Sequence, residues 1–328
     1  MDLRRLELLL ELSRLGSMRA VADVMHVTTS TVSQQVATLA REVGTPLVEP
    51  EGRRVRLTPA GRRLADHAVT ILAAVEAARA DLDPAATPVG TLRVAAFATA
   101  VRRSLLPVVR RLAETHPDVR ILVHEHEPAE ALGLLAADEV DLALTYDYNL
   151  APTTFDPSLS AVPLWSAAWS LGVPSRSPRV RGASPAILEA FRGRDWIVNS
   201  RNTADEEVLR ILASLAGFAP RIAHRADSLE LVRDMVVAGL GVGLLPAGQP
   251  TGRGVSLRSL TDPGVVLRSF AVTRRGRQDW PPLALVLRRL TRSAEESARP
   301  AVPHAGGRPG CPGVRPGRTP EHRSGPAG

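Results

Sequence analysis

The sequence is poor in several residue types, and each shortage excludes a class of protein. It has one cysteine, Cys311, so no disulfide can form within the chain, which fits a reducing compartment such as the cytoplasm. Aromatic residues make up 3 % of 328 residues, so we expect cores of leucine, valine and alanine. No apolar run approaches the roughly 18 residues of a membrane span, so no membrane contact is predicted.

Lysine is absent, so all 41 basic residues are arginine. The formal net charge of +7 permits an anionic partner without requiring one. A general bias toward arginine, alanine, glycine and proline is the simpler explanation of the missing lysine. At the start of the chain, Glu7 and Glu11 interrupt a leucine-rich patch and no small-residue cleavage site follows. We therefore expect an amphipathic helix there and not a signal peptide.

The segment "HVTTSTVSQQVATLA" (26–40) has the pattern of a helix that presents a polar face. On a helix over 30–43, one stripe that we expect to be buried holds Val32, Val36, Leu39 and Val43. The opposite face and its flanks carry small hydrogen-bonding side chains and one cation, namely Ser30, Ser33, Gln34, Thr38 and Arg41. Such a face suits the major groove of DNA. Thr28 or Thr29 can cap this helix, whose first N–H groups can meet a phosphate.

The segments on both sides strengthen this interpretation. "SMRAVADVMHV" (17–27) predicts a short helix and a tight connection, which together with 30–43 form a helix-turn-helix pattern. "GTPLVEPEGRRVRLTPAG" (44–61) predicts a hairpin that turns at Gly52. Its return carries Arg53, Arg54 and Arg56, which would contact phosphates or the minor groove as a wing. A solvated loop is the alternative.

Residues 58–83 predict one long helix, with Thr58 as N-cap and Pro59 at the first helical position. Its apolar residues are spaced 4, 3, 4, 3 and 4 apart, which is a heptad seam. The seam favours a partner helix, most simply the same helix of a second chain. Its members are Leu64, Ala68, Ile71, Val75, Ala78 and Leu82. Two prolines and a glycine in 84–90 then predict a hinge.

From residue 91 to 291, apolar strands alternate with helical patterns, which implies parallel βαβ units. Ligands bind such sheets beyond the carboxyl ends of the strands, near helix N-termini. The candidates at these places are Thr99, Ala100, Tyr146, Asn199, Ser200, Arg201 and Asp227. Arg201 could pair with a ligand carboxylate, although a plain surface charge is the alternative. Residues 292–328 lack an apolar period, and we expect them to be disordered.

Motifs for catalysis or cofactors are missing. The sequence has no nucleophile elbow, phosphate-binding glycine loop or Cys/His zinc spacing. "HEHE" places His124 and His126 on one face of a strand, but two ligands are too few for a closed metal site. We therefore predict no catalytic residue, no metal and no cofactor. Two alternatives are a soluble solute-binding receptor, which leaves 1–83 unexplained, and an α/β enzyme with an appended helical domain, which needs an acid/base or metal set.

The segment "MDLRRLELLLELSRLGSMRAVADVMHVTTSTVSQQVATLAREVGTPLVEPEGRRVRLTPAG" (1–61) resembles the winged helix-turn-helix of LysR-type transcriptional regulators. "VVAGLGVGLLP" (236–246) is similar to a late motif of their effector domain. The resemblance implies a mostly α winged helix-turn-helix, a long linker helix and an α/β effector domain over 91–291. That domain would have two lobes, like a type 2 periplasmic binding protein. The function implied is a sequence-specific regulator of transcription.

The resemblance also implies partners. These are a dyad-symmetric operator in double-stranded DNA, a polar or carboxylated small-molecule effector, further copies of the chain in a homodimer or homotetramer, and RNA polymerase if the protein activates transcription. In the family, the position of Thr99 often contacts the effector. The family usually has glutamine where Thr29 stands and arginine where Pro50 stands, so these positions bear on base preference and on the affinity of the wing.

Overall fold

The structure is a computed structural model that describes residues 1–52, 54–82, 87–201, 203–250 and 252–298. Arg53, the first part of the predicted hinge and the predicted tail beyond residue 298 lie outside the described residues. No helix within these ranges combines the length and the apolar character needed to cross a bilayer.

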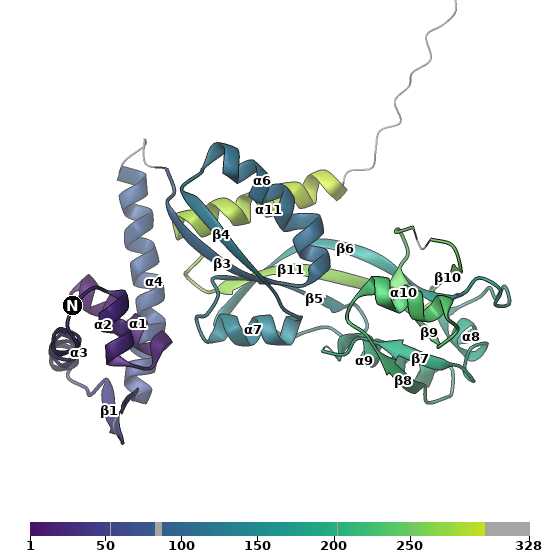
Figure 1. The fold of residues 1–328 in the computed structure, drawn as a ribbon, viewed down its shortest axis with the longest axis horizontal. Coiled ribbons are helices and arrows are strands. Elements are labelled where there is room, and N and C mark those ends of the chain that lie inside the picture. The colour runs from purple at the N-terminus through teal and green to yellow at the C-terminus, as the bar shows by residue number, and fades with distance from the viewer. Residues whose placement is uncertain (53, 83–86, 202, 251, 299–328) are drawn as a thin grey trace, which may run out of the picture. The chain divides into compact units, whose positions relative to one another are not determined.

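The first part of the chain folds as three helices followed by a two-stranded hairpin (Figure 1). These elements are α1 (Leu3–Leu15), α2 (Met18–Val24), α3 (Thr29–Val43), β1 (Val48–Glu51) and β2 (Arg54–Leu57). Thr28 caps α3, as predicted, and Gly44 ends it in the left-handed conformation. Val32, Val36 and Leu39 are buried in the core of this domain, but Val43 is 37 % exposed. The prediction for Val43 was therefore wrong, because the helix ends there and its last turn extends past the core.

Helix α4 (Pro59–Leu82) follows the hairpin and packs against α1. Thr58 Oγ1 accepts the Gly61 N–H at 3.0 Å, which confirms the predicted cap. The side chain of Thr58 also donates to the carbonyl of Pro46, so the start of α4 is tied to the approach to β1. Ala65 and Ala68 are buried in the core that α4 shares with α1, α2 and α3.

The second part of the chain alternates strands and helices. Its first half holds β3 (Gly90–Ala96), α5 (Ala98–Ala100), the π-helical turn η1 (Val101–Leu105), α6 (Leu106–Thr115), β4 (Val119–Glu125), α7 (Pro128–Ala136), β5 (Leu142–Tyr148) and β6 (Leu159–Pro174). Its second half holds α8 (Ser184–Glu189), β7 (Asp195–Val198), α9 (Ala204–Leu215), β8 (Arg221–Arg225), α10 (Leu229–Val237), β9 (Val242–Pro246), β10 (Val255–Ser259), β11 (Val265–Arg274) and α11 (Pro281–Ala298).

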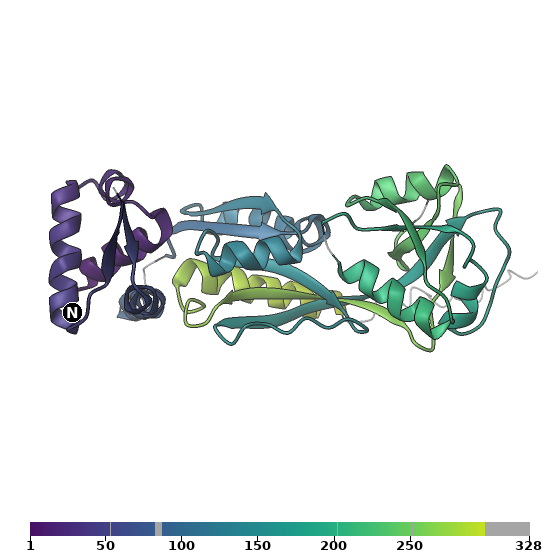
Figure 2. The ribbon, with the colours of Figure 1, turned by 90° about the horizontal axis from the view of Figure 1, so that it is seen from below.

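These strands form one continuous sheet in the order β4-β3-β5-β11-β6-β9-β7-β8, with β10 beside β6. Strands β3, β4 and β5 are parallel, as are β7, β8 and β9, which confirms the predicted βαβ units. Strand β6 is antiparallel to its neighbours and joins the two groups. The result is two lobes: lobe 1 around β3, β4 and β5, and lobe 2 around β7, β8 and β9, with β6 and β11 running between them (Figure 2).

Two boundaries differ from the prediction. Strand β10 was not predicted, because the alternation of apolar and polar residues in Val255–Ser259 covers only five residues. Helix α11 does not end at residue 291 but continues to Ala298, so the first residues assigned to the disordered tail are helical. The apolar period stops at residue 291 because "SAEESA" (293–298) has no large apolar residue, yet its alanines and glutamates still favour a helix.

The close approach of α4 to the segment before β1 generates a prediction about stability. A Cβ at Gly61 would run into the backbone carbonyl oxygen of Leu47, which cannot move without disrupting the hairpin. We expect Gly61→Ala to destabilise the N-terminal domain by about 1–3 kcal/mol, measured by chemical denaturation. Gly133→Ala in α7 is the matched control, because a Cβ there meets nothing within 4 Å. Equal stability of the two variants would contradict this packing.

Candidate functional site

The outer face of α3 is exposed and carries short polar side chains. Ser30, Ser33 and Gln34 are exposed, as is Thr29, while Thr38 is half-buried. Arg41 Nη2 donates to Thr38 Oγ1 at 2.9 Å, so the cation lies along the same face. The face is therefore shallow and rich in donors and acceptors, which is what contact with base edges in a major groove requires.

The start of α3 is held by a cluster of hydroxyl groups. Thr28 Oγ1 accepts the Thr31 N–H at 3.1 Å and lies 2.8 Å from both Ser30 Oγ and Thr31 Oγ1. Thr28 is thus committed to capping, and its predicted contact with DNA would add to this role. A capped helix start with exposed hydroxyl groups is suited to a phosphate.

The two adjacent glutamines of α3 have different environments. Gln35 is half-buried, and its Oε1 accepts a hydrogen bond from Arg5 Nε at 2.8 Å. Arg5 also pairs with Glu42, so α1 and α3 are joined at two places along α3. Gln34 is exposed and takes no part in this contact. The structure therefore separates a glutamine that holds the fold from one that is available to a partner.

The predicted wing is present as the β1–β2 hairpin, which turns at Gly52 with a φ of 61°. Arg56 Nε lies 2.9 Å from Glu49 Oε1 on the paired strand and 4.0 Å from Glu51 Oε1. A phosphate would have to compete with these carboxylates for Arg56. Arg53 lies outside the described residues, and the same holds for the side chain of Arg54.

The heptad seam of α4 is divided between two environments. Ala68 is buried in the core of its own domain, and Leu64 and Ile71 pack against the same core. Further along, Val75 is half-buried, Ala78 is exposed and Leu82 is 86 % exposed. Only the second half of the seam is therefore available to a partner chain, because the first half is occupied by α1 and its neighbours.

Between the two lobes lies a cavity of about 390 Å³. Five of the predicted ligand-binding residues line it: Thr99, Tyr146, Asn199, Arg201 and Asp227. Ala100 does not, since it is completely buried in the core of lobe 1. Ser200 also stays outside the lining; its hydroxyl instead donates to Asp227, and its backbone N–H donates to the same oxygen at 3.0 Å. Most of the predicted set is thus brought together, from segments on both lobes.

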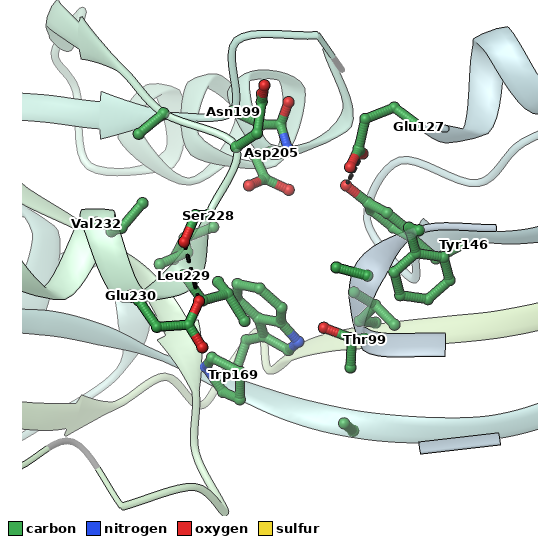
Figure 3. A pocket seen from close by; sticks show the side chains of 18 of the residues that line it. Thr99, Glu127, Tyr146, Trp169, Asn199, Asp205, Ser228, Leu229, Glu230 and Val232 are labelled. Atoms are coloured by element: carbon green, nitrogen blue, oxygen red, sulfur yellow. Dashed lines mark hydrogen bonds between the residues drawn. The ribbon is translucent and has the colours of Figure 1, made fainter. Parts of the chain in front are cut away.

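Other lining residues were not predicted. Aromatic rings form one wall of the cavity. The ring centres of Phe97 and Tyr146 lie 4.7 Å apart in an edge-to-face arrangement, and those of Phe97 and Trp165 lie 6.2 Å apart. Trp169 also lines the cavity (Figure 3). Its ring centre lies 5.6 Å from that of Tyr148, in an edge-to-face arrangement. The two tryptophans lie four residues apart on β6, so they share one face of that strand. This spacing was the available signal, but it does not tell which face of β6 meets a cavity.

Two carboxylates reach the interior of the cavity. Glu127 is 5 % exposed, and its Oε2 accepts the hydroxyl of Tyr146 at 2.9 Å. Burial raises the pKa of Glu127, while the Tyr146 hydroxyl opposes that rise. Burial also raises the pKa of Asp205, in the first turn of α9, to about 6, against a smaller lowering by the Tyr148 hydroxyl. Neither Asp205 Oδ1 nor the Tyr148 hydroxyl has hydrogen-bond geometry with any described residue.

The arginines of the cavity are largely engaged. Arg102 of lobe 1 pairs with Glu230 of lobe 2 at 3.2 Å. Arg201 Nε lies 3.0 Å from Asp227 Oδ2, and its Nη1 lies 3.5 Å from Glu130 Oε2 on lobe 1. The sequence analysis offered Arg201 as a possible partner of a ligand carboxylate, with a plain surface charge as the alternative. The structure instead surrounds it with carboxylates of the chain itself.

Comparisons with known families cover almost the whole described chain. Residues 3–62 match the model of the bacterial regulatory helix-turn-helix protein, lysR family. Residues 85–295 match the model of the LysR substrate binding domain. The first match corresponds to the helix-turn-helix with its wing, and the second corresponds to the two-lobed domain that holds the cavity.

Individual relatives agree with these matches. The chain is 28 % identical over 248 residues to the transcriptional dual regulator GltC of Bacillus subtilis, covering 75 % of this chain and 81 % of the relative. It is 28 % identical over 249 residues to the transcriptional dual regulator OxyR of Escherichia coli, covering 75 % and 79 %. A full-length OxyR variant of Pseudomonas aeruginosa has the same fold, with a TM-score of 0.66 at 19 % identity, covering 90 % of this chain and 95 % of that one. The chain therefore belongs to the LysR family, whose members are DNA-binding transcriptional regulators with an effector-binding domain.

Proposed function

We propose that two copies of the chain bind a dyad-symmetric DNA site, each through α3 and the β1–β2 wing, and that a small molecule in the cavity between the lobes controls this binding. The observation that carries the proposal is the outer face of α3, which is exposed and polar while the opposite stripe of the helix is packed in the core. An ordinary solvated helix face would carry more charged residues, whereas Arg41 and Glu42 are the only charged residues in the sequence of α3.

The parts have separate roles in this proposal. Residues 1–61 bind DNA, 58–83 pair the chains, 84–90 connect, and 91–291 bind the effector. Base contacts come from Ser30, Ser33, Gln34 and Thr38, with Thr29 at the helix start. Phosphate contacts come from Arg41 and from the wing arginines Arg53, Arg54 and Arg56. The dimer contact is made by Val75, Ala78 and Leu82, the seam residues that the domain's own core leaves available.

The effector acts by changing the balance between lobe positions. Thr99, Tyr146 and Asp205 come from different segments and face one cavity, so a ligand that touches all three favours the closed arrangement. A ligand shifts such an equilibrium only by the difference of its affinities for the two states. Lobe closure in paired chains would change the separation of the two α3 helices and so the affinity for DNA.

Some properties of the relatives are not transferred. The relatives are regulators, and we propose that this chain likewise has no enzymatic activity and acts in the cytoplasm, where its DNA is. One group of relatives carries the name hydrogen peroxide-inducible genes activator. Peroxide sensing by a thiol needs a reactive cysteine, and the sequence has only Cys311, in the proline- and glycine-rich segment beyond α11. The effector proposed here is therefore a ligand and not an oxidant.

The two glutamines of α3 provide a matched test of base contact. We expect Gln34→Ala to weaken binding to the operator by roughly 1–3 kcal/mol and to leave binding to random DNA nearly unchanged. The operator is first located by footprinting on the DNA upstream of the chain's own gene. Gln35→Ala, which removes the acceptor of Arg5, should lower stability without changing the ratio of operator to random affinity. Equal losses on both DNAs for Gln34→Ala would contradict a base contact.

The wing should act without regard to sequence. Arg53→Ala combined with Arg54→Ala is expected to weaken binding about equally on operator and random DNA, because phosphates are the same on both. The slope of log affinity against log salt should flatten by roughly one unit for each phosphate that the wing no longer neutralises. Fluorescence anisotropy at several salt concentrations measures both. A reduced affinity for the operator alone, at an unchanged salt slope, would rule out this role.

Dimer formation through the end of α4 is tested at its most exposed apolar residue. Leu82→Glu should shift the protein toward monomer in analytical ultracentrifugation and weaken operator binding, because it places a charge in the seam. Leu215→Glu makes the same change at a leucine of α9 that is 57 % exposed, and should leave the α4 pairing intact. A dimer that persists in Leu82→Glu would show that the chains pair elsewhere.

A further inference from the structure

The cavity between the lobes is acidic inside although the chain is basic overall. Five carboxylates line it, against three arginines: Glu125, Glu127, Asp205, Asp227 and Glu230, against Arg102, Arg103 and Arg201. The chain as a whole has the opposite balance, with a net charge of +7. Since acids are the minority in the chain and the majority here, the cavity concentrates negative charge.

We propose that this cavity binds an organic cation, a small molecule that joins a protonated amine to an apolar body, and that Glu127 and Asp205 receive the amine. This inference rests on the proposed function only in taking the cavity to be the effector site. It replaces the carboxylated effector that the sequence suggested.

The location of the charges, and not only their number, supports a cation. The lining arginines are at the rim, where solvent screens them: the side chain of Arg102 is 68 % exposed and that of Arg201 is 37 % exposed. Glu125 and Glu230 are exposed like these arginines, but Glu127 is only 5 % exposed. A ligand that fills the cavity therefore meets carboxylates where water is excluded, and electrostatic interactions are strongest there.

The rim arginines are also already compensated. Arg102 pairs with Glu230, and Arg201 pairs with Asp227 and Glu130. The guanidinium of Arg103 lies over Trp165, 4.3 Å from the centre of its ring. An anionic ligand would have to displace these contacts, whereas Glu127 feels the charge of Arg201 without a direct ion pair and Asp205 is acted on mainly by burial.

Asp205 gives an independent observation, a carboxylate oxygen that is poorly satisfied by the chain itself. Its Oδ1 is inaccessible to solvent and makes no hydrogen bond of good geometry in the described part of the chain, and the nearby Tyr148 hydroxyl only partly offsets the rise that burial causes in its pKa. An ionised carboxylate in such a place costs free energy unless a cation or a donor meets it. Figure 3 shows the carboxylate of Asp205 directed into the cavity, across from Glu127 with its bond to Tyr146. An ammonium group has three N–H donors and a positive charge, so it can serve both carboxylates.

The aromatic wall fits the rest of such a ligand. Phe97, Tyr146, Trp165 and Trp169 border the same space, in a chain with only four tryptophans and two tyrosines. Their rings offer apolar area and electron-rich faces, both of which attract an organic cation. A hydrated metal ion would gain little from this wall, and no three acidic, imidazole or thiol groups of the described residues are placed to hold one.

The test compares molecules that differ only in charge. Full-length protein is titrated with 2-phenylethylamine and 3-phenylpropionate, and with cyclohexylmethylamine and cyclohexylacetate, while tryptophan fluorescence and thermal melting are recorded. Trp165 and Trp169 line the cavity and report occupancy directly. In each pair we expect the amine to bind at least about tenfold more tightly than the carboxylate.

Isosteric variants assign the effect to the two carboxylates. Glu127→Gln and Asp205→Asn should each weaken amine binding by about tenfold or more, because each removes one charge that faces the ammonium group. Glu189→Gln is the matched control: this exposed acid of α8 pairs with Arg192 at 2.8 Å, and its replacement should change amine affinity by less than about twofold.

Three results would overturn the proposal: carboxylates that bind as tightly as their amines, no binding of either amine at millimolar concentration, or unchanged amine affinity in both variants. Binding of the same samples to the DNA upstream of the chain's own gene is measured alongside. If DNA binding persists while the amine preference fails, only the ligand class is refuted. If DNA binding is itself missing, the proposed function is refuted, and the fluorescence result still decides what the cavity holds.

Discussion

The pairing of one long strand with both lobes is the constraint on which the second domain depends. Strand β6 pairs with β11 over residues 159–169, and with β9 and β10 over residues 169–174. Both lobes are therefore parts of one hydrogen-bonded sheet, and they cannot separate without breaking its ladder. In the proposed mechanism, the lobes change their angle through bending of β6 and β11. This leaves the space between them open to a ligand while keeping its walls in register.

Position in the fold explains which site residues could be predicted from the sequence and which could not. The 3.6-residue period of Val32, Val36 and Leu39 predicted the orientation of α3, because local spacing decides which face is buried. The cavity residues at strand ends were also predictable, since parallel sheets place ligands there. Glu127, at the N-cap of α7 just after β4, and Asp205, in the first turn of α9, lie in the same kind of place but were not predicted, because this rule gives the neighbourhood of a site and not which side chains turn into it.

The heptad seam shows a second limit of local patterns. A spacing of four and three residues predicts that one stripe of α4 is covered, but it does not predict which partner covers it. Ala68 and its neighbours are covered by the domain's own α1, while Leu82 remains exposed. Similarly, Ala100 follows Thr99 directly, yet one lies in the core and the other lines the cavity, because successive residues of a helix point about 100° apart.

The rim of the cavity joins the lobes by exposed ion pairs, Arg102 with Glu230 and Arg201 with Glu130. Such pairs are weak and are screened by salt. The proposed contacts of α3 and the wing with phosphates would be weakened by salt as well, because counterions bind the DNA again. Ionic strength would thus act on this protein at two places. It would lower the affinity for DNA, and it would weaken the ion pairs that join the two lobes.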